Sequence, residues 1–275
     1  MRLMKSDSMS YQGTEPLSND VLRRYAPSIF ASEPHSSRSD RFGFSSTIEM
    51  VEGLRGEGFM PFFVAQQRTR NESKREFTKH MIRYRRADQM NASEALEIIH
   101  INGHDGSAAA QLIGGCLVSV CTNGLICGDS IERIHVPHRS NCARLVIEGA
   151  YSMLAHFEKI RGAIDGMKTL QLTSGEQNAF AEAALQIRYD DPEKPAPITP
   201  ARALQPRRVE RDPNSLWSTF NRVEENLSKG GQTGVNAQGQ RRATRQVNSI
   251  TGKLGLERAL WTLAEKMAEL KGGTN

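Results

Sequence analysis

Alternating polar and apolar residues in the first half of the chain predict an antiparallel sheet. A polar turn over residues 71–75 joins the first two predicted strands. Asn123-Gly124 separates two later apolar runs, and this dipeptide is the strongest short-range signal for a β-hairpin. The expected strands are residues 59–70, 76–86, 95–101, 116–122 and 125–131.

Apolar residues spaced three or four apart predict helices around this sheet. The longest covers residues 141–164, and its apolar stripe would pack on the sheet. Ser46 and Glu49 have the spacing of a capping box, and Asp105 would cap a short helix over residues 106–113. The other helices are expected at residues 17–25, 173–187, 215–229 and 256–270. Asn214 or Ser215 would cap the third of these, and Gly230-Gly231 would end it. The predicted fold class is therefore α+β: an antiparallel sheet packed by a long helix, with a helical C-terminal extension.

Changes in composition divide the chain into four segments. Polar residues 1–16 are expected to form a flexible arm, and residues 17–188 an α+β core domain. Residues 189–206 hold five of the eleven prolines, which favours a linker. Residues 207–275 form a helical C-terminal region, with a basic, glycine-rich loop at 232–250 that is expected to be mobile.

Composition also excludes several classes of protein. No stretch reaches the ~18 uncharged apolar residues of a membrane-spanning helix. The N-terminus lacks the apolar run of a signal peptide, so we expect a cytoplasmic protein. All four cysteines lie within 27 residues without a CxxC pair, which indicates reduced thiols and no zinc site. Dinucleotide-binding, P-loop, nucleophile-elbow and HExxH motifs are absent, so we expect no cofactor, no metal and no enzymatic activity.

The net charge of +5 conceals a strong segregation of charge along the chain. Residues 61–86 carry eight Lys or Arg against two Glu, whereas residues 87–201 carry eight basic and fourteen acidic residues. Residues 226–256 carry five basic residues and no acidic one. Such segregation is typical of a surface that binds a polyanion. The alternative is a solvated surface without a partner.

Strand alternation would gather many of these cations on one plane. Within residues 76–86, Lys79, Arg83 and Arg85 fall on one side, while His80 falls on the other side, toward the core. An exposed basic plane with aromatic rings nearby would suit the phosphates and bases of nucleic acid. The candidate phosphate contacts are Arg68, Arg70, Lys74, Arg75, Lys79, Arg83, Arg85, Arg241, Arg242 and Arg245.

Residues 102–107 form the most polar cluster between apolar elements, and they allow three interpretations. If a helix starts after Asp105, the backbone N–H groups of Gly106 and Ser107 would bind a phosphate, with His104 beside them. A sharper interpretation makes His104 a general base that Asp105 orients. The third is structural, with Asp105 as a helix cap.

Six segments, in an order that spans nearly the whole chain, resemble the phage/plasmid-like family known as domain of unknown function 932. They are YAPSIFASEPH (25–35), FTKHMIRYR (77–85), NGHDGSAAA (102–110), CTNGLICGD (121–129), VIEGAY (146–151) and NRVEENLSKGG (221–231). The resemblance implies an accessory protein of a phage, plasmid or integrative element, and it implies no particular reaction.

These observations predict a non-enzymatic DNA-binding protein of a mobile element that acts in recombination or replication. The expected partners are nucleic acid, single-stranded DNA in particular, and further copies of the same chain. The predicted architecture is similar in outline to the single-strand annealing proteins of phages, which is an analogy of fold alone. Two alternatives remain: an anti-defence or conjugation accessory protein that binds a host protein, and a phosphodiester-acting enzyme centred on His104 and Asp105.

Overall fold

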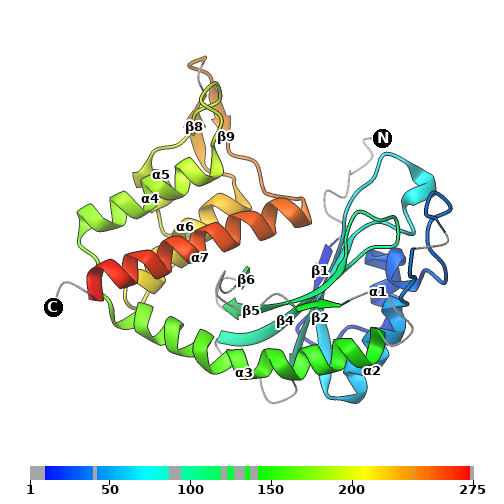
Figure 1. Cartoon of the computed structure of the whole chain (residues 1–275). Helices are drawn as coiled ribbons and strands as arrows, with labels where there is room; N and C mark the ends of the chain where they lie inside the picture. The colour runs from blue at the N-terminus through cyan, green and yellow to red at the C-terminus, as the bar shows by residue number, and fades with distance from the viewer. Residues whose placement is uncertain are drawn as a thin grey trace. The chain divides into compact units, whose positions relative to one another are not determined.

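The structure, a computed structural model, describes residues 10–39, 42–86, 94–118, 123–126, 134–136, 142–236 and 238–272. The chain falls into two compact units, divided within its longest helix between Phe157 and Glu158 (Figure 1). The first unit carries a large sheet, and the second is mainly helical. The division therefore lies inside residues 17–188, which composition had suggested as one core domain.

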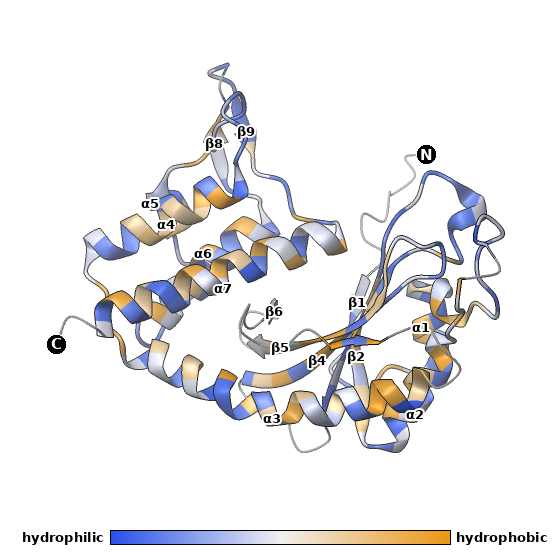
Figure 2. Cartoon of the chain, viewed as in Figure 1, coloured by the Kyte–Doolittle hydropathy of each residue, from blue (hydrophilic) through white to orange (hydrophobic). Residues whose placement is uncertain are grey.

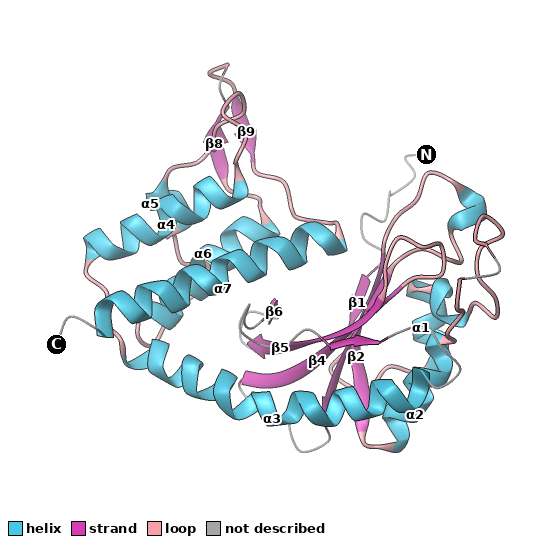
Figure 3. Cartoon of the chain, viewed as in Figure 1, coloured by secondary structure: helices cyan, strands magenta, loops and turns pink. Residues whose placement is uncertain are grey.

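Within the described residues, seven strands form the sheet of the first unit (Figure 3). Their order is β1-β2-β3-β4-β5-β6, and β7 also pairs with β5. The β1–β2, β2–β3, β3–β4, β4–β5 and β5–β7 pairs are all antiparallel. The strands are β1 Ser10–Gln12, β2 Phe59–Gln66, β3 His80–Arg86, β4 Glu94–Asn102, β5 Ala110–Val118, β6 Asn123–Ile126 and β7 Ile134–Val136.

Helices pack on this sheet through small and apolar residues. The long helix α3 runs over Cys142–Thr169, and Gly149 near its start lies directly against Leu112 of β5 and Ile134 of β7. The ring of Tyr151, two residues on, meets the ring of Phe59 edge-on at 5.7 Å. Figure 2 shows the apolar residues recurring along these helices. The other helices of this unit are α1 Asn19–Tyr25, η1 Pro27–Phe30, α2 Thr47–Gly56 and η2 Glu72–Lys74.

The second unit is a small helical assembly with one hairpin. Its aromatic core stacks the ring of Phe220 on Trp217 at 5.6 Å and places it edge-on to Trp261 at 6.0 Å. Lys271 binds Glu176 at 2.7 Å, which joins the end of the last helix to the start of α4. The elements are α4 Ser174–Arg188, α5 Pro200–Ala203, α6 Leu216–Lys229, β8 Thr233–Val235, β9 Arg241–Ala243 and α7 Ile250–Gly272.

The α+β fold class, the antiparallel sheet, the long helix and the helical C-terminal extension are confirmed. Three caps are confirmed as well. Ser46 accepts a hydrogen bond from the Glu49 N–H, Ser215 accepts one from the Ser218 N–H, and Gly230 ends α6 with a φ of 64°. Each cap satisfies or redirects backbone groups that the helix itself leaves unpaired.

Three local predictions are wrong. Residues 106–113 do not form a helix, because β5 already begins at Ala110 and pairs with β4 along its whole length. Asn123 and Gly124 lie inside β6 and do not form the hairpin turn. The loop at 232–250 contains the β8–β9 hairpin. The proline-rich segment at 189–206 includes the short helix α5, which is compatible with a linker.

The remaining expectations concern termini, thiols and membranes. Part of the expected N-terminal arm pairs with β2 as strand β1, and residues 1–9 lie outside the described residues. Cys116 and Cys142 are buried free thiols, while Cys121 and Cys127 lie outside the described residues. Among the residues that the structure describes, no helix has the length and apolar character needed to cross a membrane.

Candidate functional site

The expected basic plane on β3 is not exposed. Arg83 and Arg85 retain only 2% and 5% of their accessible surface, and both bind the buried carboxylate of Glu97 on β4. Arg85 Nε donates to Glu97 Oε1 at 2.7 Å, and Arg83 Nη1 donates to Oε2 at 3.3 Å. Their guanidinium groups also lie over the rings of Phe62 and Phe63. These two arginines are therefore structural, and their assignment as exposed phosphate contacts is wrong.

The reason is the register of the sheet. Arg83 on β3 pairs with Ile99 on β4, and residues two apart on a strand point to the same side. Arg83, Arg85 and Glu97 therefore lie on one face of the sheet. Three charges on one face can be buried together when they compensate one another and hydrogen-bond. The face also carries apolar residues, which is why alternation alone did not reveal its burial.

The other predicted cations of this unit lie on or next to the connection between β2 and β3. Arg68, Arg70 and Arg75 are exposed, and Lys74 and Lys79 are half-buried. Lys74 lies in η2, whose start is capped by the Asn71 side chain accepting from the Ser73 N–H at 3.1 Å. This basic loop keeps the surface charge expected of it, although it is not part of a plane with Arg83 and Arg85.

The predicted phosphate site at residues 104–107 does not form. No helix begins there, so there is no helix N-terminus to bind an anion. The Ser107 N–H donates to Asp105 Oδ1 at 3.0 Å, in a local turn. His104 is fully buried, with its Nε2 at 3.1 Å from Thr47 Oγ1. A histidine held inside the core cannot reach a phosphodiester, which removes the geometry required by the enzyme alternative.

His104 belongs to a buried hydrogen-bond network whose proton positions can be deduced. The Ser28 N–H donates to Gln66 Oε1, which fixes the orientation of that amide, and the Ser28 hydroxyl donates its one proton to the same oxygen at 2.8 Å. Ser28 Oγ must therefore accept from His80 Nδ1, at 2.8 Å.

With its proton on Nδ1, His80 accepts at Nε2 from the Thr47 hydroxyl, at 3.0 Å. Thr47 Oγ1 then accepts from Asn102 Nδ2 at 2.9 Å and from His104 Nε2. The neutral form of His80 thus satisfies every bond of the network.

Burial keeps the neighbouring histidines neutral. Desolvation is the main cause that lowers the pKa of His80 well below its ordinary value, and His104 and His100 add to the effect. Desolvation also lowers the pKa of His100 to about 4, and neither of its ring nitrogens has a hydrogen-bond partner in the described part of the chain. Among the described residues, no three His, Cys, Asp or Glu side chains are placed to hold a metal ion.

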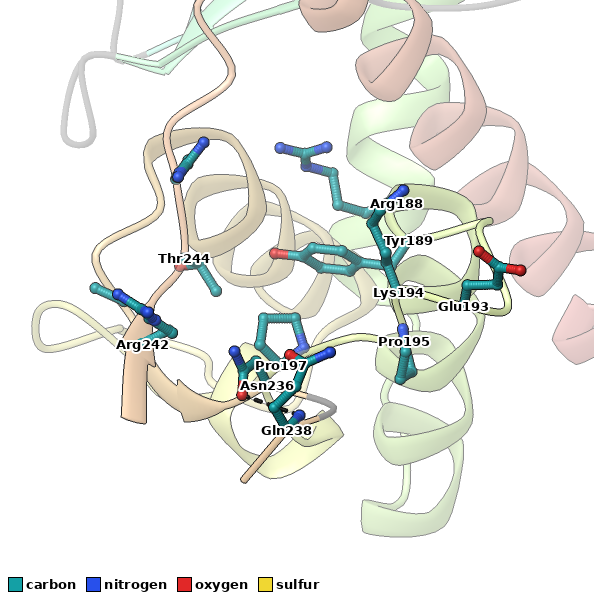
Figure 4. A pocket seen from close by; sticks show the side chains of 12 residues that line it. Arg188, Tyr189, Glu193, Lys194, Pro195, Pro197, Asn236, Gln238, Arg242 and Thr244 are labelled. Carbon is teal, nitrogen blue, oxygen red and sulfur yellow. Dashed lines mark hydrogen bonds between the residues drawn. The ribbon is translucent and has the colours of Figure 1, made fainter. Parts of the chain in front are cut away.

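The best candidate site lies in the second unit, in a pocket of about 400 Å³. Three segments form it: the end of α4, the proline-rich linker, and the β8–β9 hairpin with the residues that follow (Figure 4). We call it the cationic pocket. Its lining residues are Arg188, Tyr189, Glu193, Lys194, Pro195, Pro197, Asn236, Gln238, Arg242, Ala243, Thr244 and Arg245.

The pocket is electrostatically unbalanced. Within the described residues, no carboxylate forms an ion pair with Arg188, Arg242 or Arg245, and Arg188 Nε is buried without a hydrogen-bond partner. Lys194 binds Asp191 at 2.7 Å, but 81% of its side chain is exposed, so this pair is worth little. One acidic residue, Glu193, belongs to the lining. Such a set favours an anionic ligand.

Tyr189 gives the pocket an aromatic wall. Figure 4 shows its ring projecting among the arginine, proline and amide side chains. The Arg188 guanidinium lies 5.3 Å from the centre of this ring. Burial raises the pKa of the Tyr189 phenol, so the hydroxyl stays protonated at neutral pH and can donate a hydrogen bond. The arrangement can therefore bind phosphate and a flat ring together.

Comparison with known proteins identifies the family. Residues 34–261 match the family described as "Domain of unknown function (DUF932)". The chain belongs to this family. Over 252 residues, 92% of this chain and 92% of each relative, it is 43% identical to UPF0380 protein YfjQ and 42% identical to UPF0380 protein YafZ, both of Escherichia coli strain K12. No solved structure matches the chain significantly.

The DUF932 match includes the segments that build the cationic pocket. One of the six segments that resemble the family, NRVEENLSKGG, holds these segments in place through hydrogen bonds. Within NRVEENLSKGG, the Asn226 amide donates to the Ala203 and Gln205 carbonyls, and its oxygen accepts from Arg207 Nε and Gln232 Nε2. Asn226 thereby ties α5 and the base of the hairpin to α6.

Two glycines allow the hairpin to dock. A Cβ on Gly234 of β8 would lie 1.7 Å from the Pro197 carbonyl oxygen, the same oxygen that accepts from the Val235 N–H at 2.7 Å. A Cβ on Gly230 would lie 2.6 Å from the Arg245 carbonyl carbon. Only residues without a side chain permit these close approaches.

The sequence prediction included two of the residues that line the cationic pocket. Arg242 and Arg245 line the cationic pocket, while Arg241 is exposed on β9 and does not line it. It missed Arg188, Tyr189 and Lys194, because they lie in the stretch 87–201, whose total charge is negative. The available signal was the Arg-Tyr pair at the start of the proline-rich segment, with Lys194 close behind.

Proposed function

We propose that this protein binds nucleic acid through the cationic pocket and the exposed arginines of the β8–β9 hairpin. The observation that carries the proposal is the set Arg188, Arg242 and Arg245, which line the same pocket as Tyr189 and have no carboxylate partner among the described residues. Arginine binds phosphate oxygens in bidentate fashion, and aromatic rings stack on bases. The proposed role is binding without catalysis, as part of the machinery of a mobile element.

Charge segregation supports the same proposal. Within residues 226–256 there are five basic residues and no acidic one, and three of the five lie on or just after β9. The exposed loop between β2 and β3 adds a second group of cations in the first unit. Oligomerisation, which single-strand annealing would require, is part of the proposal and awaits sedimentation analysis.

The test measures binding of labelled oligonucleotides by fluorescence anisotropy over a range of salt concentrations. The variant Arg242→Ala/Arg245→Ala removes two pocket cations. Each lost phosphate contact should lower the log–log salt slope by ~0.7 for a single strand, so the slope should fall by ~1.4. Affinity at low salt should fall with it.

The matched control is Lys159→Ala/Arg161→Ala, which removes two exposed cations from α3 outside the pocket. It should leave the slope nearly unchanged. An equal loss in both double variants would show that net charge, and not the pocket, controls binding. Absence of salt-dependent binding by the unmodified protein would overturn the proposal and favour a protein partner.

A further inference from the structure

The cationic pocket is adjacent to a second pocket of the same unit, with a volume of about 520 Å³. Arg188 lines both pockets. The backbone also passes directly from one to the other, since Arg245 lines the first and Gln246 the second. Each volume lies within the range of sites for small ligands, roughly 300–1,000 Å³. The two pockets therefore form adjacent compartments around one arginine.

The second pocket has a different chemistry. Arg188 is the one charged residue of its lining. Ile187, Leu256 and Ala259 supply an apolar wall, and the side-chain amides of Gln246 and Asn248 have no hydrogen-bond partner in the described chain. Nucleobases have apolar faces and hydrogen-bonding edges, so apolar walls with unpaired amides suit them. Only Arg188 in this lining could pair with the charge of a phosphate.

We propose that the two pockets bind successive nucleotides of one unpaired strand, an inference that rests on the proposed function and specifies its ligand. One base stacks on Tyr189 in the cationic pocket, with Arg242 and Arg245 at its phosphate. Arg188 binds the phosphate that links it to the next nucleotide, whose base enters the second pocket.

Burial explains why the strand must be unpaired. Tyr189 is half-buried within its pocket, and Arg188 Nε is fully buried. Bases in a duplex are stacked on both faces and paired at their edges, so they cannot enter such recesses without being extruded. Phosphates and bases are common to DNA and RNA, and the experiment therefore includes both.

The test uses a glycine that borders the second pocket. Gly255 on α7 lines the second pocket and has no atom within 4 Å of the position its Cβ would take, so the side chain of Gly255→Leu begins in open space beside this pocket and is expected to obstruct it. Gly162 on α3 is equally open and lies outside both pockets, which makes Gly162→Leu the matched control. Probes are thymidine 5′-monophosphate, oligothymidylates of two to ten nucleotides, an oligouridylate, and a blunt duplex as competitor.

Gly255→Leu should weaken binding of the oligonucleotides about tenfold, the usual effect of one lost base contact, and leave mononucleotide binding unchanged. Gly162→Leu should change neither. Tyr189→Leu should weaken both kinds of probe, whereas Tyr189→Phe, which keeps the ring and loses only the hydroxyl, should weaken them much less. The duplex should compete at least tenfold less well than the single strands.

The outcomes separate the two proposals. If Arg242→Ala/Arg245→Ala weakens binding but Gly255→Leu does not, the cationic pocket stands and the second pocket is excluded. If the duplex competes as well as the single strands, the inference that the ligand is an unpaired strand is overturned. If the unmodified protein binds none of the probes, both proposals fail. Comparison of the oligothymidylates with the oligouridylate assigns DNA or RNA.

Discussion

At the scale of single residues, arginine side chains have opposite roles in the two units. Arg83 and Arg85 compensate Glu97 inside the first unit, whereas Arg242 and Arg245 have no acidic partner among the described residues of the second. The sequence shows arginine in both places. What distinguishes them is the residue on the neighbouring strand, which alternation along one strand cannot reveal.

The Glu97 carboxylate should be a major contributor to the stability of the first unit. Glu97→Ala removes the carboxylate that two buried guanidinium groups bind, so the free energy of unfolding should fall by ~3–5 kcal/mol in urea denaturation. Glu76→Ala, which removes an exposed carboxylate in the same unit, should change it by less than ~0.5 kcal/mol. Similar values for the two variants would contradict the buried ion pairs.

The buried histidines should make the first unit sensitive to acid. The pKa values of His80 and His100 in the folded protein lie below 6.5, so between about pH 4 and 6.5 the unfolded chain binds more protons than the folded one. Stability must then decrease as pH falls through this window. Each such histidine contributes up to ~1.4 kcal/mol per pH unit.

The variant His100→Leu isolates one of these residues. It removes a ring with two unpartnered nitrogens, so stability at neutral pH should not suffer from lost hydrogen bonds. The slope of stability against pH, measured by urea unfolding at several pH values, should become shallower by up to ~1.4 kcal/mol per unit. An unchanged slope would show that His100 is not the titrating group.

At the scale of elements, the sequence predicted what depends on local pattern. The long helix α3, the caps Ser46 and Ser215, and the end of α6 at Gly230 all follow from periodicity and capping chemistry. The errors at 106–113 and 232–250 have a common cause. Both segments form antiparallel pairs with a neighbouring strand, β5 with β4 and β8 with β9, and this cross-strand pairing overrides the local preference of each segment.

Contact between α3 and the sheet should depend on Gly149. A Cβ there would lie 2.9 Å from Leu112 Cδ1 and 3.2 Å from Ile134 Cγ2, so Gly149→Ala should cost ~1–3 kcal/mol through overpacking. Gly162→Ala in the same helix meets open space and should gain up to ~1 kcal/mol from helix propensity. Opposite shifts of the melting temperature are therefore expected. Two stabilised variants would mean that α3 does not pack closely at Gly149.

At the scale of the whole molecule, the two units divide the features described above. The buried ion pairs and histidines belong to the first unit, and the cationic pocket belongs to the second. Sequence composition placed a boundary after residue 188, at the proline-rich segment. The compact units instead divide within α3, because a continuous helix carries no compositional mark where its packing partners change.

This division allows the units to be followed separately, because both tryptophans of the chain, Trp217 and Trp261, lie in the second. Both are buried, so tryptophan emission reports on unfolding of that unit. The acid-sensitive histidines lie in the first unit, and far-ultraviolet circular dichroism reports on the strands and helices of that unit as well as on the helices of the second. Lowering the pH from 7 to about 5 should therefore move the unfolding transition seen by circular dichroism to a lower urea concentration, while the transition seen by tryptophan emission moves less. Glu97→Ala should widen the gap further. Curves that move together under both changes would show that α3 couples the units into one cooperative transition.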